Sequence, residues 1–210
     1  MDKIAAQLVK KWSNPKDIEA GVELMHWLDC FDRQFFQNFP EVQFSTVQWV
    51  FTVRYFRPIA GVGEESYTIY LYKLAETIEM AAANRTLVGL DGTTMKYPKN
   101  LWASRKEVMI SIAGHEVRHR LQQMAFLKKI TAQDEECTAD PLLKQTIGFV
   151  KNRFKEKERI YQERGESAWF IKKRLDDEEF DATVVEYLIG SLLYRGANLK
   201  QIAAVIQIQS

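Results

Sequence analysis

The segment from His115 to His119, which reads His-Glu-Val-Arg-His, constrains this chain more than any other stretch. On a helix, residues four positions apart lie on the same face, so His115 and His119 can present two imidazole groups to one metal ion. Glu116 directly follows the first histidine, where its carboxylate can act as a general base toward water activated by the metal. The sequence therefore predicts a helix that carries a metal site with a general base beside it.

The residues around this motif favour a helix. The segment from Ser104 to Glu107 has the spacing of a capping box, which predicts that the helix begins there. Apolar residues then recur at helical spacing, at Val108, Ile112, Ala113, Val117, Leu121, Met124 and Leu127. We therefore expect one face of this helix to pack into the core.

Composition limits the class of protein. A chain of 210 residues with 46% hydrophobic content is long enough for one packed core, so we expect a single domain over residues 1–210. The 29 Lys and Arg nearly balance the 28 Asp and Glu, which disfavours nucleic acid and acidic membranes as partners. Cys30 and Cys137 match no metal-ligand spacing and are expected to be buried free thiols. No long apolar run or secretory signal is recognisable, so the sequence predicts a cytoplasmic protein that does not bind membranes.

The first hundred residues predict N-terminal helices followed by a small sheet. Ile4, Leu8 and Trp12 share one helical face, and Asn14 with Pro15 is typical of the start of a second helix that runs toward Pro40. Residues 47–58 and 67–74 have the texture of two strands, expected to pair antiparallel. Residues 77–88 are ambiguous between helix and strand, and their position favours a third, edge-type strand. Residues 90–100 are expected to form a loop.

The C-terminal half predicts two further long helices. Residues 142–164 alternate opposite charges, which favours a solvated helix face with ion pairs over a nucleic-acid-binding surface. Gly165 is expected to separate this helix from the next one. Residues 176–182, Asp-Asp-Glu-Glu-Phe-Asp-Ala, open a last helix whose continuation is apolar enough to be buried. Acidic residues are favoured in a first helical turn, but hydrolytic zinc usually has three protein ligands, so this cluster can also supply the missing one.

The motif of His115, Glu116 and His119, followed about 60 residues later by a glutamate-rich helix, resembles the gluzincin metallopeptidases, in particular the compact minigluzincin-type domains. The resemblance implies an α+β, zincin-like fold in which a small antiparallel sheet packs on the active-site helix and a glutamate helix, with extra helices. It makes Glu179 the third metal ligand and Ala182 a close-packing residue. Glu178 is the second choice for the ligand, and Asp177 the third.

The resemblance also implies a function. One zinc ion held by His115, His119 and Glu179 would activate water, with Glu116 as the general base that passes the proton to the leaving amine. A peptide or protein substrate would lie extended against the edge strand expected near residues 78–88. Tyr187 and Tyr194 are candidates for stabilising the oxyanion, although tyrosines at helical spacing are more often core residues.

The chain departs from the family pattern in two places. Arg118 puts a charge inside the motif, where it can reach solvent or a carboxylate, because it projects about 100° from His119 around the helix. The long interval to Glu179 implies a charged helical insertion over about residues 128–168, which would cover the cleft. Two other functions stay open: a non-catalytic zincin-like regulatory or partner-binding domain, and an interaction protein that uses the charged residues 151–174. The substrate and the oligomeric state stay open as well.

Overall fold

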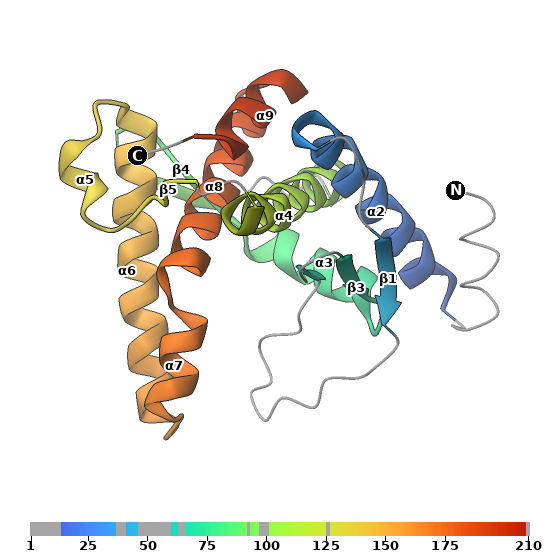
Figure 1. The fold of residues 1–210 in the computed structure, drawn as a ribbon, viewed down its shortest axis with the longest axis horizontal. Helices are drawn as coiled ribbons and strands as arrows, with labels where there is room; N and C mark the ends of the chain where they lie inside the picture. The colour runs from blue at the N-terminus through green and yellow to red at the C-terminus, as the bar shows by residue number, and fades with distance from the viewer. Residues whose placement is uncertain are drawn as a thin grey trace. The chain divides into compact units, whose positions relative to one another are not determined.

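The structure, a computed structural model of the chain, describes residues 14–36, 41–45, 60–62, 66–91, 93–96, 101–124 and 127–208. These residues form mainly helices together with two small sheets, which confirms the expected α+β class (Figure 1). The helix predicted around Ile4 to Trp12 and the strand predicted over residues 47–58 lie outside the described residues. The described residues fall into two compact units. The first unit consists of the residues up to Arg85 together with α4 (Leu101–Met124) as far as Val117. The second unit consists of Thr86–Lys96 and the residues from Arg118 onward.

The first unit contains a three-stranded sheet that is mixed rather than antiparallel. Strand β3 (Ser66–Tyr70) lies in the centre, parallel to β1 (Glu41–Ser45) and antiparallel to β2 (Ala60–Val62). The register of the parallel pair places Val42 opposite Tyr67 and Phe44 opposite Ile69. The second predicted strand is confirmed only as far as Tyr70, because the chain turns there and starts a helix at Leu74.

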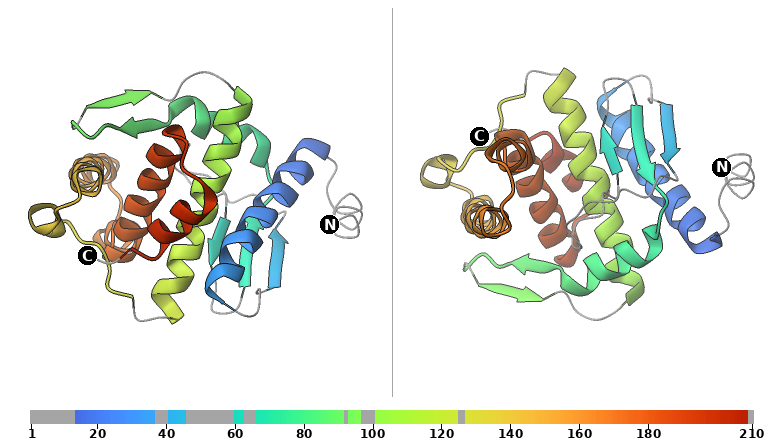
Figure 2. Two further views of the ribbon diagram at one scale, coloured as in Figure 1. Left: turned by 90° about the horizontal axis from the view of Figure 1, so that it is seen from above. Right: turned by 90° about the horizontal axis from the view of Figure 1, so that it is seen from below.

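Helix α2 (Pro15–Phe35) begins as predicted. The Asn14 side chain accepts a hydrogen bond from the Lys16 amide at 3.1 Å, and Pro15 occupies the first turn, where no intrahelical partner is needed. The helix contacts β3 and α3 (Leu74–Asn84) within this unit (Figure 2). The core of this unit is apolar and fully or almost fully buried at Leu24, Leu28, Phe31, Tyr67, Ile69, Leu71, Leu74 and Ile78.

The prediction of an edge strand over residues 77–88 is wrong, because α3 occupies this segment as far as Asn84. The cause is a cap that comes from a distant part of the chain. Lys73, at the N-cap position, has a positive φ of 52° and makes no side-chain cap, but the Ala75 amide donates to the buried Asp17 carboxylate at 2.9 Å. The alanine-rich middle of the segment then follows its helical propensity. Only β4 (Thr86–Val88) is extended.

Replacing Asp17 with alanine is expected to lower the free energy of unfolding by about 1–2 kcal/mol, because the start of α3 loses its cap. Urea denaturation followed by circular dichroism measures this change. Asp29→Ala on the same helix is the matched control, since Asp29 makes only a solvent-accessible ion pair with Arg33 and should cost less than about 1 kcal/mol. Equal losses in the two variants would contradict the capping role of Asp17.

The second unit is built around helix α8 (Asp177–Tyr194). This helix contacts α6 (Pro141–Glu163), α9 (Leu199–Ile206) and β4. Strand β4 pairs antiparallel with β5 (Thr94–Lys96), so residues 90–100, predicted as a loop, include the second strand of a hairpin. Two short helices, α5 (Asp134–Cys137) and α7 (Ala168–Arg174), precede and follow α6.

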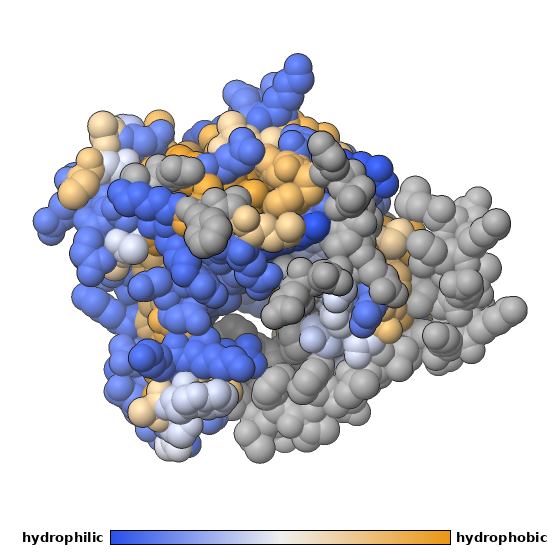
Figure 3. Space-filling model, in the orientation of Figure 1, coloured by the Kyte–Doolittle hydropathy of each residue, from blue (hydrophilic) through white to orange (hydrophobic). Residues whose placement is uncertain are grey.

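The charged helix α6 has the solvated face that its sequence predicts. Asp140 caps its start by accepting from the Leu143 amide at 2.8 Å, and Gly165 follows its end with a φ of 73°. Arg159 pairs with Glu156 and Glu163, and all three side chains are more than half exposed. Figure 3 shows hydrophilic residues over most of the visible surface of this helix. Among the described residues, no helix combines the length and apolar character needed to cross a bilayer.

Candidate metal centre

Helix α4 is continuous through the histidine motif, from His115 to His119. It begins at Leu101, so the predicted start at Ser104 is wrong. Ser104 is only 4% exposed and lies inside the helix, and the apolar residues that follow give the helix its buried face. His115 and His119 are one turn apart, so the helix geometry itself places their rings on one side.

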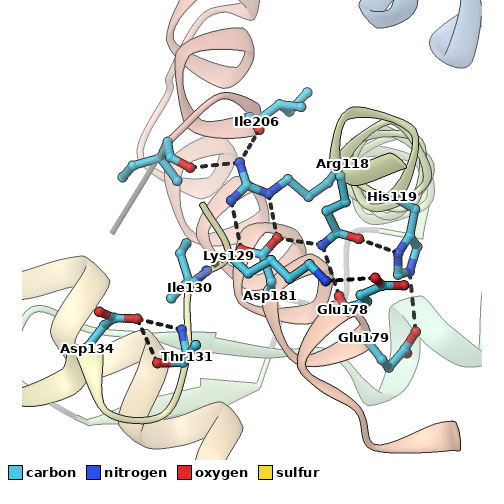
Figure 4. Close-up of polar contacts among 12 residues, drawn as sticks. Arg118, His119, Lys129, Ile130, Thr131, Asp134, Glu178, Glu179, Asp181 and Ile206 are labelled. Atoms are coloured by element: carbon cyan, nitrogen blue, oxygen red, sulfur yellow. Dashed lines mark hydrogen bonds and ion pairs between the residues drawn. The ribbon is translucent and has the colours of Figure 1, made fainter. Parts of the chain in front are cut away.

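Helix α8 supplies the carboxylate. Asp176 caps this helix by accepting a hydrogen bond from the Glu179 amide at 2.8 Å, which places Glu179 in the first turn. Glu179 Oε2 lies 3.4 Å from His119 Nε2 (Figure 4). One potential ligand atom from each of His115, His119 and Glu179 lies within 4.8 Å of the other two. The structure thus brings together the three residues that the sequence singled out, and their role as ligands stays a prediction.

The two alternative ligands make other contacts or are exposed. Glu178 Oε1 accepts a hydrogen bond from Lys129 Nζ at 2.7 Å, and the Glu178 side chain is about half exposed (Figure 4). Asp177 is exposed at the start of α8. Among the described residues, the group that could hold a metal ion contains Glu179 and neither Glu178 nor Asp177.

Glu116 is buried, with 8% of its surface exposed. It directly follows His115 on α4, so its carboxylate projects about 100° around the helix from that histidine. A carboxylate beside two histidines that could hold a metal ion is a candidate for proton transfer.

Arg118, the charged residue inside the motif, binds a carboxylate and is completely buried. Its Nε and Nη2 donate to Asp181 Oδ2 and Oδ1 at 2.7 and 2.8 Å, which is a bidentate pair with both side chains 0% exposed. Its Nη1 donates to the carbonyl oxygens of Ile206 and Ile208 at 2.8 and 2.7 Å. The sequence left open whether Arg118 reaches solvent or a carboxylate, and the structure shows that it reaches a carboxylate.

Asp181 connects this ion pair to the histidine motif. Besides Arg118, its carboxylate accepts hydrogen bonds from the Ile130 amide at 2.9 Å and from Gln122 Nε2. Gln122 also contacts His119, with 2.9 Å between Oε1 and the ring Nδ1. A chain of direct contacts therefore runs from Arg118 to His119.

Sequence reasoning missed two residues of α6 whose titration is influenced by Glu179. Burial lowers the pKa of Lys157, and the Glu179 carboxylate opposes that shift. Burial also raises the pKa of Tyr161; the Arg174 guanidinium opposes this shift, and the Glu179 carboxylate adds to it. The helices meet here through Phe154 and Phe180, whose ring centroids are 5.2 Å apart. In the sequence, nothing distinguishes Lys157 and Tyr161 from the other residues of this charged helix.

The tyrosines that the sequence offered for the oxyanion lie further along α8. Tyr187 packs edge-to-face on Phe149 at 5.0 Å and has Arg153 over its ring at 5.5 Å. Tyr194 is 45% exposed, at the end of the helix. With a rise of 1.5 Å per residue, Tyr187 is about 12 Å and Tyr194 about 22 Å from Glu179 along the helix axis.

Two imidazoles and one carboxylate fit a catalytic zinc ion in both number and type, since such sites use three protein ligands and leave one position open. The hydrogen bond at His119 Nδ1 leaves Nε2 directed toward Glu179, as a metal-binding imidazole requires. Comparisons of the chain with models of known protein families, with curated proteins and with solved structures returned no match.

Proposed function

We propose that this protein is a zinc-dependent metallopeptidase of the gluzincin type, with a zincin-like arrangement of α4 and α8. The observation that carries the proposal is the group of His115, His119 and Glu179, whose potential ligand atoms lie within 4.8 Å of one another. Glu116 adds the group that distinguishes a hydrolytic site from a structural one, because a structural zinc site has no use for a general base.

A zinc ion at this site would supply a Lewis acid that polarises a peptide carbonyl and activates water. The residues of the chain would perform the remaining steps. His115, His119 and Glu179 would hold the ion. Glu116 takes the proton from the attacking water and gives it to the departing amine nitrogen, so that the amine leaves as a neutral group.

The proposed substrate is a peptide or a protein. The edge strand expected to bind it over residues 78–88 is not formed. Most of that segment is helix α3. The remaining strand, β4, uses part of its backbone within its own unit, because the Val88 amide donates to Ser191 Oγ at 3.2 Å and the Val88 carbonyl accepts from Arg195 at 3.1 Å. The part of the chain that would bind the peptide backbone is therefore left unassigned.

Chelation is expected to abolish cleavage of a mixed peptide library by the zinc-loaded protein, and added zinc should restore it, because the metal is required for the chemical step. Mass spectrometry of the library before and after each treatment measures the effect. Cleavage that persists after complete removal of metal would contradict the proposal. Tight zinc binding without cleavage of any peptide would instead favour the non-catalytic, partner-binding domain.

A further inference from the structure

We propose that Gln122 is a positioning residue of the metal centre that fixes the tautomer of His119 and ties this histidine to the segment carrying Glu179. This inference rests on the metal site of the proposed function, and it assigns a role to a residue outside the histidine motif. Gln122 lies three positions after His119 on α4 and is buried, with 9% of its surface exposed.

The contacts of the Gln122 side chain determine which end of its amide faces the histidine. Two acceptors surround Nε2, namely the Glu178 carbonyl oxygen at 3.1 Å and Asp181 Oδ2. Neither can donate a hydrogen bond, because a carbonyl oxygen carries no hydrogen and both Asp181 oxygens accept from Arg118, so the NH₂ group must point toward them. The opposite end, Oε1, then faces His119 Nδ1 at 2.9 Å.

This orientation selects one form of the imidazole. The amide oxygen of Gln122 can only accept, so His119 Nδ1 must carry a hydrogen and donate it. In the neutral ring, the lone pair is then on Nε2, and Glu179 Oε2, 3.4 Å away, is also an acceptor, so a cation between the two atoms would satisfy both. A metal ligand needs that lone pair, so the contact prepares His119 for binding before any ion arrives.

Gln122 is itself held in place from two sides. Asp181 is fixed by the bidentate Arg118 and by the Ile130 amide, and all of these groups are buried. On the other side, Gln122 Nε2 donates to the carbonyl of Glu178, the residue immediately before Glu179. One side chain therefore holds both a histidine ligand on α4 and the backbone next to the carboxylate ligand on α8 (Figure 4 shows the residues on either side of it).

The test compares Gln122→Met with Gln123→Met. Methionine keeps the length and most of the volume of glutamine but makes no comparable hydrogen bond, and Gln123 is an exposed neighbour on the same helix. Competition with a chromophoric chelator measures the zinc dissociation constant. Gln122→Met is expected to bind zinc about 10–100-fold more weakly than wild type, and Gln123→Met with unchanged affinity. Unchanged affinity in Gln122→Met would overturn the inference.

A second readout does not depend on metal or on how well Gln122→Met folds. In the metal-free wild-type protein, the ¹⁵N shifts of the His119 ring, assigned by their absence in His119→Gln, should report a hydrogen on Nδ1. A ring with a hydrogen on Nε2 and none on Nδ1 would overturn the inference. If the wild-type protein binds no zinc, the proposed function fails, but this measurement still decides the role of Gln122.

Discussion

Arg118→Met is expected to lower the free energy of unfolding by about 3–5 kcal/mol, because it leaves the buried Asp181 carboxylate without its bidentate partner. The same substitution removes the donor to the carbonyls of Ile206 and Ile208, so the end of α9 loses its contact with α4. Equilibrium unfolding in urea, followed by circular dichroism, measures the loss.

Arg159→Met is the matched control for this experiment. Arg159 also pairs with two carboxylates, but on the solvated face of α6 with more than half of its side chain exposed, so its loss should cost less than about 1 kcal/mol. A second variant, Arg118→Met combined with Asp181→Leu, removes both buried charges and should be more stable than Arg118→Met alone. A cost for Arg118→Met as small as that of Arg159→Met would contradict the structural role of the ion pair.

Glu116→Gln is expected to reduce kcat/KM for peptide cleavage by a factor of about 10²–10⁴, because the amide cannot take a proton from water. Glutamine has nearly the shape of glutamate and Glu116 is not one of the three ligands, so zinc content should not change. Steady-state assays on a cleaved library peptide, together with elemental analysis, measure both quantities on the same preparation.

Glu107→Gln provides the comparison for Glu116→Gln. Glu107 is a half-buried glutamate nine residues earlier on α4, and burial raises its pKa. Its replacement should leave both turnover and zinc content unchanged. Full turnover in Glu116→Gln would remove the general base from the mechanism, and loss of zinc from that variant would assign Glu116 a ligand role instead.

Local chemistry in the sequence was enough to locate several helices. Asn14 with Pro15 and the acidic residues from Asp176 onward mark helix starts, because a side-chain cap needs only its near neighbours. The spacing of His115 and His119 likewise needs only a helix. The choice of Glu179 used the family resemblance, and its proximity to His119 follows from how α4 and α8 pack in the second unit.

The features that sequence reasoning missed depend on residues far apart along the chain. Helix α3 is capped by Asp17, 58 positions before Ala75, so residues 77–88 gave no local sign of their helical start. Strand β3 pairs in parallel with β1, a contact that periodicity cannot indicate. Arg118 and Asp181 are 63 positions apart, and only the packed structure shows that the charge inside the histidine motif is neutralised.

The zinc content of the purified protein after incubation with zinc, measured by elemental analysis, tests the metal centre most directly. We expect about one zinc per chain in wild type and in Glu178→Ala, and little or none in His115→Ala, His119→Ala and Glu179→Ala, because each of the last three removes one of the three residues proposed as ligands. A wild-type protein without zinc, or a Glu179→Ala variant that keeps its zinc while Glu178→Ala loses it, would contradict the site described above.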